Sequence, residues 1–256
     1  MERLVLLESI DTPCDLIIYD EVDSTNDAAK RLFVERADTS SEMPLVVLAD
    51  RQTAGRGRLG REWASPFGGV YLSVSVPLDV VDERLSALPL VVACAVFEAL
   101  ERLVHEYAGD RKTALELFEY TEDAYVGRIR IKWPNDILVV GGTHVGKLAG
   151  ILAETIGSRK DSRGVGIVQA IIGVGINVAR PSAGADGRAC YLSDLLPEIG
   201  VQTCAAVAAR TIDAICEELG RWRAEAFSFA PFHDGYVARM ALLGEGAHDD
   251  VLKTGT

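Results

Sequence analysis

The pattern of hydrophobic and polar positions predicts a mixture of strands and helices. Residues 68–76 alternate apolar and polar side chains, which is typical of a strand with two different faces. Residues 84–109 are rich in Ala, Leu and Val and end at a glycine, which predicts a mostly buried helix. The other predicted strands are residues 16–20, 44–50, two within 128–140, 144–156 and 164–178, and the other predicted helices are 24–37, 205–224 and a piece after Pro231.

The order of these elements indicates the fold class. The predicted strands 144–156 and 164–178 follow each other as a hairpin, and the second is rich enough in Ile and Val to be central. Strict alternation of strand and helix is therefore absent, which favours an α+β (mixed α/β) fold in which helices flank one central mixed β-sheet. Residues 110–127 are polar and poorly patterned, and they predict an insertion or a connection.

Charge and apolar content restrict the partners of the chain. It has 256 residues, 48% of them hydrophobic, and a net charge of −12. A protein that coats nucleic acid needs a basic face, so we expect no nucleic-acid partner. No apolar stretch reaches the roughly 18 residues of a membrane span. The N-terminus carries acids where a signal peptide would carry cations, so we expect a cytoplasmic protein without a membrane partner.

The cysteines do not indicate a metal site. The five are Cys14, Cys94, Cys190, Cys204 and Cys216. No two of them form a CxxC pair, and the four histidines show no ligand spacing with them. We therefore interpret them as reduced cysteines and assign no metal ligand.

Residues 53–63, TAGRGRLGREW, interleave glycine with arginine and end at Trp63. Glycines allow the backbone to approach a ligand closely, and guanidinium groups donate to phosphate or carboxylate oxygens. Trp63 offers a flat face on which a base can stack. The sequence alone leaves two interpretations open, a loop that grips a small anion and a solvated turn whose tryptophan lies in the core.

Residues 141–148, GGTHVGKL, match the beginning of a phosphate-binding P-loop. The next position of that motif requires Ser or Thr, but it is Leu148 here, and the residues that follow are typical of a strand. A true P-loop is therefore not expected. Lys147 still fits a phosphate contact, although a lone lysine on a hairpin would have the same surroundings.

Two further motifs combine polar residues or glycines with predicted strands. In KWPND, Lys132, Asn135 and Asp136 form a polar cluster between two apolar strands, as functional sites at strand ends often do. An ordinary strand–turn is the alternative. GVGIN, at residues 173–177, fails the dinucleotide-binding fingerprint because Val178 occupies the third glycine position.

Taken together, these motifs resemble one family. EVDSTN, GRGRLGREW, KWPND, GKLAGIL and GVGIN occur in this order, as in the biotin–protein ligases, in their form without an N-terminal helix-turn-helix domain. The resemblance covers about residues 16–240. It implies a catalytic domain of the class II aminoacyl-tRNA synthetase and biotin–lipoate ligase type in residues 1–240. Residues 241–256 would be a truncated remnant of the small C-terminal β domain of the family, and no repressor role is expected.

The resemblance also implies a reaction in two steps. The carboxylate of biotin attacks the α-phosphate of ATP, with Mg²⁺, to give biotinyl-5′-AMP and pyrophosphate. A lysine of a biotin carboxyl carrier protein then attacks the intermediate and releases AMP. The alternatives are a lipoate or octanoate ligase of the same superfamily and a non-catalytic paralogue that binds biotin or a nucleotide. Residues 68–76 could pair across a homodimer, although a strand buried within one chain would have the same pattern.

Site residues follow from the same resemblance. The implied catalytic residues are Arg56, Lys147 and Asp136, of which Asp136 would orient Lys147 or a magnesium ion. The implied biotin-binding residues are Ser24, Thr25, Asn26, Gln52, Gly55, Arg56, Gly57, Arg58, Lys147 and Gly150. The implied ATP- and adenylate-binding residues are Arg58, Arg61, Trp63, Lys132, Asn135 and Asn177. Because Leu59 stands where many members have arginine, we expect the intermediate to be held less firmly.

Overall fold

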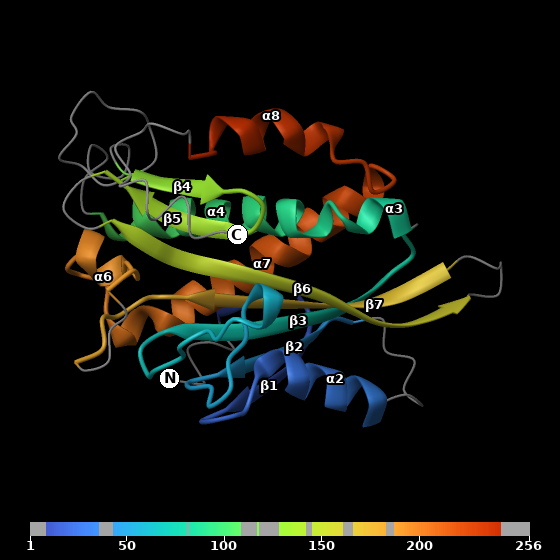
Figure 1. The fold of residues 1–256 in the computed structure, drawn as a ribbon, viewed down its shortest axis with the longest axis horizontal. Helices are drawn as coiled ribbons and strands as arrows, with labels where there is room; N and C mark the ends of the chain where they lie inside the picture. Colours follow the sequence, from blue (N-terminus) through green and yellow to red (C-terminus); the bar gives the residue numbers. More distant parts are fainter. Residues whose placement is uncertain are drawn as a thin grey trace.

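The centre of the protein is a seven-stranded mixed sheet with the strand order β1-β2-β3-β7-β6-β5-β4 (Figure 1). The computed structural model describes residues 9–35, 43–80, 82–108, 117, 128–141, 145–160, 166–182 and 187–241. The strands are β1 (Asp15–Tyr19), β2 (Leu45–Ala49), β3 (Val70–Leu78), β4 (Arg128–Lys132), β5 (Asp136–Val140), β6 (Gly146–Lys160) and β7 (Gly166–Ile176). β1 and β2 pair in parallel and the other neighbours pair antiparallel, so the predicted mixed sheet with β7 at its centre is confirmed.

The helices largely follow the predicted pattern. They are α2 (Thr25–Glu35), α3 (Asp82–Leu85), α4 (Leu88–Tyr107), α6 (Leu192–Leu195), α7 (Cys204–Ala224) and α8 (Ala230–Ala238), with the 3₁₀ turns η1 (Arg58–Gly60) and η2 (Val201–Thr203). The predicted helix 84–109 divides into α3 and α4, and Pro89 lies in the first turn of α4. α6 and η2 were not predicted, because such short turns carry no periodic signal.

Two helix layers cover opposite faces of the sheet. α4 and α7 pack together on one face, where Leu72 and Val74 of β3 join the main hydrophobic core (Figure 1). α2 covers the other face over β2, β3 and β7. Ser73 of β3 points to this second face, because its hydroxyl lies 2.8 Å from Oγ1 of Thr25 on α2. The alternation predicted for residues 68–76 is thus an apolar face on the helix pair and a more polar face toward α2.

Strand order decides one alternative that the sequence left open. β3 lies between β2 and β7, and both of its edges are paired. Residues 71–75 are paired on both edges within one chain, so the pattern of this segment is that of a buried strand and these residues do not pair across a homodimer.

Two predicted regions fall largely outside the described residues. Of the predicted insertion 110–127 only Leu117 is described, and it is buried. Of the predicted remnant 241–256 only Ala241 is described, and its backbone N–H donates to Ile131 of β4 at 2.9 Å. Within the part of the chain that is described, no helix combines the length and the apolar character needed to cross a membrane.

Candidate active site

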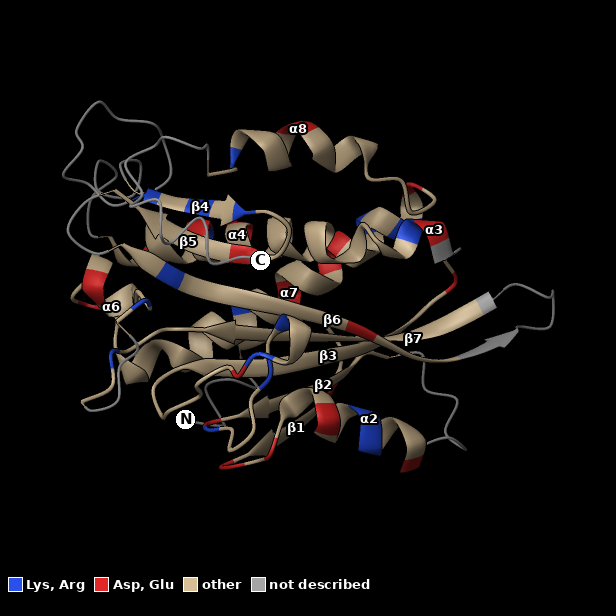
Figure 2. Cartoon of the chain, in the orientation of Figure 1, with Lys and Arg blue, Asp and Glu red and all other residues tan. Residues whose placement is uncertain are grey.

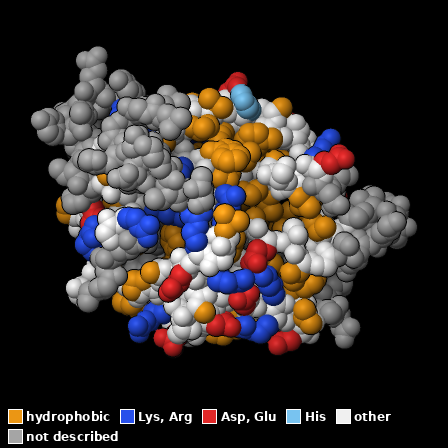
Figure 3. Space-filling view, viewed as in Figure 1, with side chains coloured by type: hydrophobic (Ala, Val, Ile, Leu, Met, Phe, Trp, Pro, Cys, Tyr) orange, Lys and Arg blue, Asp and Glu red, His pale blue; other side chains and the backbone are white. Residues whose placement is uncertain are grey.

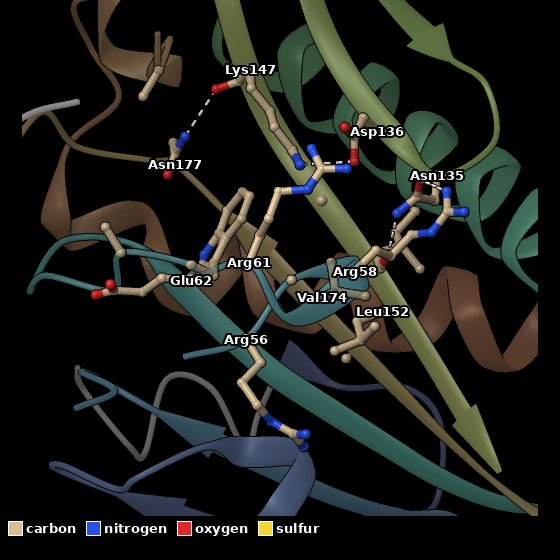
Figure 4. Close-up of a pocket in the computed structure, with 18 of the residues that line it drawn as sticks. Arg56, Arg58, Arg61, Glu62, Asn135, Asp136, Lys147, Leu152, Val174 and Asn177 are labelled. Carbon is tan, nitrogen blue, oxygen red and sulfur yellow. Dashed lines mark hydrogen bonds and ion pairs between the residues drawn. The ribbon is translucent and has the colours of Figure 1, made fainter. Parts of the chain in front are cut away.

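A pocket of about 360 Å³ lies on the face of the sheet that α2 partly covers. The basic loop, residues 53–63, forms part of its wall together with the β4–β5 turn and strands β6 and β7 (Figure 4). The predicted site residues that line it are Ser24, Thr25, Asn26, Gln52, Arg56, Gly57, Arg58, Arg61, Trp63, Lys132, Asn135, Asp136, Lys147, Gly150 and Asn177. Tertiary structure therefore brings together nearly the whole predicted set.

Glycines on the strands make room for the side chains of this pocket. A Cβ atom on Gly175 of β7 would lie 2.4 Å from Nε1 of Trp63, and one on Gly150 of β6 would lie 2.9 Å from Cζ3 of the same ring. A Cβ on Gly173 would lie 2.3 Å from Oδ1 of Asn26. Real Cβ atoms do not approach so closely, so the glycines of GKLAGIL and GVGIN serve close packing against the basic loop and α2.

One end of the pocket is rich in cations. Nζ of Lys147 lies 2.8 Å from Oδ1 of Asp136 and 4.9 Å from the centre of the Trp63 ring. Figure 4 shows the Arg61 side chain reaching toward this pair. Burial, reinforced by the nearby charges of Lys147 and Arg61, lowers the pKa of Lys132, although Asp136 opposes the shift. Such a concentration of positive charge is suited to an anionic group.

The β4–β5 turn holds the basic loop from one side. Nη1 of Arg58 donates to Oδ1 of Asn135 at 2.9 Å, and Nδ2 of Asn135 donates to the carbonyl of Ile151 at 2.6 Å. The peptide bond between Trp133 and Pro134 in this turn is cis. Asn135 therefore links the loop to β6 and fixes where the Arg58 guanidinium lies.

The opposite end of the pocket is lined by buried hydrogen-bonding side chains. The backbone N–H of Thr25 donates to Oε1 of Gln52 at 2.8 Å, and Nε2 of Gln52 donates to Oγ of Ser65 at 2.8 Å. The hydroxyl of Ser73 donates to Oδ1 of Asn26 at 2.6 Å. Ser24, only 2% exposed, caps the first turn of α2, since its Oγ accepts from the backbone N–H of Asp27 at 3.4 Å. Hydrogen bonds hold these groups in place, and they suit a neutral polar ligand group.

Arg56 differs from the other arginines of the loop in its direction. Figure 4 shows its guanidinium pointing away from Lys147, toward α2. Its Nη2 donates to Asp27 and lies 3.4 Å from Oε2 of Glu154. Although burial opposes the shift, hydrogen bonds from Lys30 and Asn26 help to hold the pKa of Glu154 below its usual value.

Two of the predicted site residues, Asn177 and Gly55, make contacts that support the local structure. Nδ2 of Asn177 donates to the backbone carbonyl of Lys147 at 2.9 Å and so joins the end of β7 to β6. Gly55 is a buried residue of the basic loop and is not among the residues that line the pocket. A Cβ there would lie 2.4 Å from the carbonyl of Trp63, so Gly55 is required by the shape of the loop.

No group of three His, Cys, Asp or Glu side chains converges on a metal-sized site among the described residues. Asp136, the carboxylate at the cation-rich end, is already paired with Lys147. A site of this composition does not fit a metal held by protein ligands alone. Magnesium that accompanies phosphate groups keeps several waters and needs only one or two carboxylates.

Residues 19–177 match the biotin/lipoate A/B protein ligase family. The chain belongs to this family. The match contains the basic loop, KWPND, the GKLAGIL strand and GVGIN, so the family predicted from these motifs is confirmed.

Members of the ligase family with known names or structures extend this result. A biotin–[acetyl-CoA-carboxylase] ligase of Paracoccus denitrificans is 33% identical over 82% of this chain and 75% of its own length. A biotin protein ligase from Aquifex aeolicus, solved with biotin and ATP, has a TM-score of 0.60 at 28% identity. The superposition covers 90% of this chain and 80% of the Aquifex chain. A biotin protein ligase from Leishmania major, solved with biotinyl-5-AMP, has a TM-score of 0.58 at 26% identity, with coverages of 90% and 82%.

Several residues that line the pocket were not predicted. Leu152 and Val174 lie beside the strand glycines, and the predicted strands could have indicated them. Arg188 and Tyr191 belong to a segment that contains no recognisable motif. A backbone hydrogen bond holds this segment beside the pocket, because the N–H of Lys147 donates to the carbonyl of Arg188 at 2.8 Å. No local sequence signal marks such a contact.

Proposed function

We infer that this chain is an ATP-dependent biotin–protein ligase of the biotin–[acetyl-CoA-carboxylase] ligase class. The observation that carries this conclusion is a single pocket with two chemically different ends. One end offers fixed neutral hydrogen-bonding groups, which match the ureido ring of biotin. The other end gathers cations, which match a carboxylate and the phosphates of ATP. Relatives with this fold bind biotin with ATP, and biotinyl-5-AMP.

The first step requires little more than positioning and charge. The biotin carboxylate attacks the α-phosphate, a P–O bond to the β-phosphate breaks, and pyrophosphate leaves. We propose that Lys147 meets the carboxylate and the α-phosphate, and that Arg58 and Arg61 stabilise the negative charge of the transition state. Asp136 orients Lys147 through the 2.8 Å ion pair. Trp63 lies against the strand glycines and limits the adenine side of the pocket, with Lys132, Asn135 and Asn177 on the nucleotide side.

Magnesium enters this scheme with ATP. The absence of a three-ligand cluster among the described side chains is consistent with a Mg²⁺ ion bound mainly through phosphates and water.

In the second step a lysine amine of a biotin carboxyl carrier protein attacks the acyl carbon of the intermediate. AMP leaves with the bonding electrons of the C–O bond, and the amine loses a proton. The pocket must therefore open to the lysine without releasing the adenylate. We propose that the basic loop, which forms part of the pocket wall, controls this opening.

ATP–pyrophosphate exchange with biotin, compared with lipoate and octanoate, tests the proposed substrate. Exchange that depends on biotin, followed by transfer of labelled biotin to a carrier domain, is the expected result. Exchange with lipoate alone would reassign the chain to the other branch of the family. Binding of biotin and ATP without any labelling would identify a non-catalytic paralogue.

A further inference from the structure

The basic loop is held to the fold on both sides by arginine side chains. Within the loop the backbone bonds to itself, with Trp63 N–H donating to Gly55 at 2.9 Å and Gly57 N–H to Arg61 at 2.7 Å. The Arg58–Asn135 bond ties one side to the β4–β5 turn. On the opposite side of the loop, the Arg56 side chain contacts Asp27 of α2 and Glu154 of β6.

Arg56 belongs to a ring of four alternating charges. It contacts Asp27 and Glu154, and Lys30 lies 3.5 Å from Asp27 and 2.8 Å from Glu154. The four side chains are 24% to 39% exposed, so water screens these pairs only in part. Figure 3 shows acidic and basic side chains intermixed on this face where α2 lies, and Figure 2 shows both signs of charge on α2 itself.

Glu154 also reaches the floor of the pocket. Its Oε2 accepts from Nδ2 of Asn26 at 2.7 Å, while Oδ1 of Asn26 accepts from Ser73. Asn26 is only 3% exposed and lines the end of the pocket that we assign to biotin. One carboxylate therefore contacts both a pocket-floor residue and the loop above it.

We propose that Asp27 and Glu154 are positioning residues that latch the basic loop through Arg56. The Arg56 guanidinium then anchors the loop and does not act on the reacting phosphate, while Arg58 and Arg61 keep that role. Because Glu154 also holds Asn26, correct seating of biotin and closure of the loop depend on the same carboxylate. This inference rests on the proposed biotin ligase function.

Four variants test the latch: Arg56→Gln, Asp27→Asn, Glu154→Gln and the double variant Arg56→Gln/Glu154→Gln. Each single change is expected to raise the KM for biotin and the release rate of biotinyl-5′-AMP roughly three- to tenfold, because partly exposed ion pairs are individually weak. In Asp27→Asn and Glu154→Gln, kcat for pyrophosphate exchange at saturating biotin is expected to stay within about twofold. The double variant is expected to be less affected than the two single variants added together, since both changes break the contact between Arg56 and Glu154.

Arg31→Gln is the matched control. It removes an ion pair of α2, Arg31 to Asp23 at 2.8 Å, and this pair involves no side chain of the four-charge ring of Arg56, Asp27, Lys30 and Glu154. It is expected to leave release and KM unchanged. Raising the salt concentration is expected to speed release from the wild type and the control but to have little effect on Arg56→Gln. A 100-fold loss of kcat in Arg56→Gln, with Asp27→Asn and Glu154→Gln unaffected, would overturn the latch.

Hydrogen exchange without substrates separates this inference from the proposed function. The amides of residues 53–63 are expected to exchange at least threefold faster in Glu154→Gln and Asp27→Asn than in the wild type and Arg31→Gln. Unchanged exchange in the loop would refute the latch whatever the substrate. Faster loop exchange without any biotin-dependent pyrophosphate exchange would leave the latch standing and refute the ligase assignment.

Discussion

Lys147 of β6 and Asp136 of β5 lie on neighbouring antiparallel strands and form an ion pair, with Nζ and Oδ1 2.8 Å apart. The contact joins two motifs, GKLAGIL and KWPND, that are separate in the sequence. It holds the Lys147 ammonium group at the cation-rich end of the pocket, where we place the α-phosphate. The pair is partly exposed, so we expect it to matter for geometry more than for stability.

Lys147→Ala is expected to lower the rate of adenylation by roughly 10²- to 10³-fold, the usual effect of removing one group that stabilises transition-state charge. Asp136→Asn, which keeps the shape but weakens the orientation of Lys147, is expected to cost less, about tenfold. Pyrophosphate exchange measures both effects. The melting temperature is expected to change little in either variant, so normal exchange combined with a large drop in melting temperature would contradict the proposed role.

Gly175→Ala is expected to impair substrate binding because the new Cβ would lie 2.4 Å from Nε1 of Trp63 and displace the ring. Overpacking of this kind typically lowers the free energy of unfolding by about 1–3 kcal/mol. Because the displaced ring borders the side of the pocket that we assign to adenine, we expect the KM for ATP to rise roughly tenfold or more. The matched control is Gly220→Ala on α7, where no atom lies within 4 Å of a Cβ. The control is expected to stabilise the protein by about 0.5–1 kcal/mol without a change in KM. Equal kinetics in both variants would show that Trp63 does not need its present position.

Leu59→Arg tests the expectation that Leu59 weakens retention of the intermediate. Leu59 is 80% exposed, has a φ of 57° and is not among the residues that line the pocket. An arginine at this backbone position is expected to project into solvent, so the release rate of biotinyl-5′-AMP should stay within about twofold. Slower release by tenfold or more would restore the original expectation. Leu59→Gly is expected to stabilise the fold by about 0.5–1 kcal/mol, because glycine adopts positive φ without strain.

Glu218→Gln is expected to stabilise the protein at neutral pH. Glu218 on α7 is 5% exposed, and burial, together with the carboxylates of Glu98 and Glu217, raises its pKa. A raised carboxyl pKa contributes stability that is present below the unfolded-state pKa and is lost as the pH rises through the higher folded-state pKa. The neutral amide avoids this loss, so we expect a gain of roughly 1 kcal/mol at pH 7 and a smaller one at pH 4.

Thermal unfolding of the wild type and Glu218→Gln at both pH values measures this difference. Destabilisation by Glu218→Gln at pH 7 that is smaller or absent at pH 4 would mean that the ion pair of Glu218 with Arg221, at 3.6 Å, outweighs the cost of burial.

The local part of the fold could be predicted because it depends on short-range periodicity. The alternation in β3, the apolar run of β7 and the glycine-containing motifs each reflect which face of a strand or helix is buried, and neighbouring residues decide this. The site residues were predicted because the motifs that carry them resemble those of one family. The same reasoning could not find Glu154 or Arg188, since each acquires its place through contacts with residues distant in the sequence.

The sequence by itself determined the strands and helices, the family and most of the residues that line the pocket. Only the tertiary structure decided the direction of each side chain. It turned Arg56 away from Lys147 toward Asp27 and Glu154, and it placed Leu59 outside the pocket. The physical reason is that direction depends on strand order, loop backbone angles and long-range ion pairs. None of these is fixed by the residues adjacent in the chain.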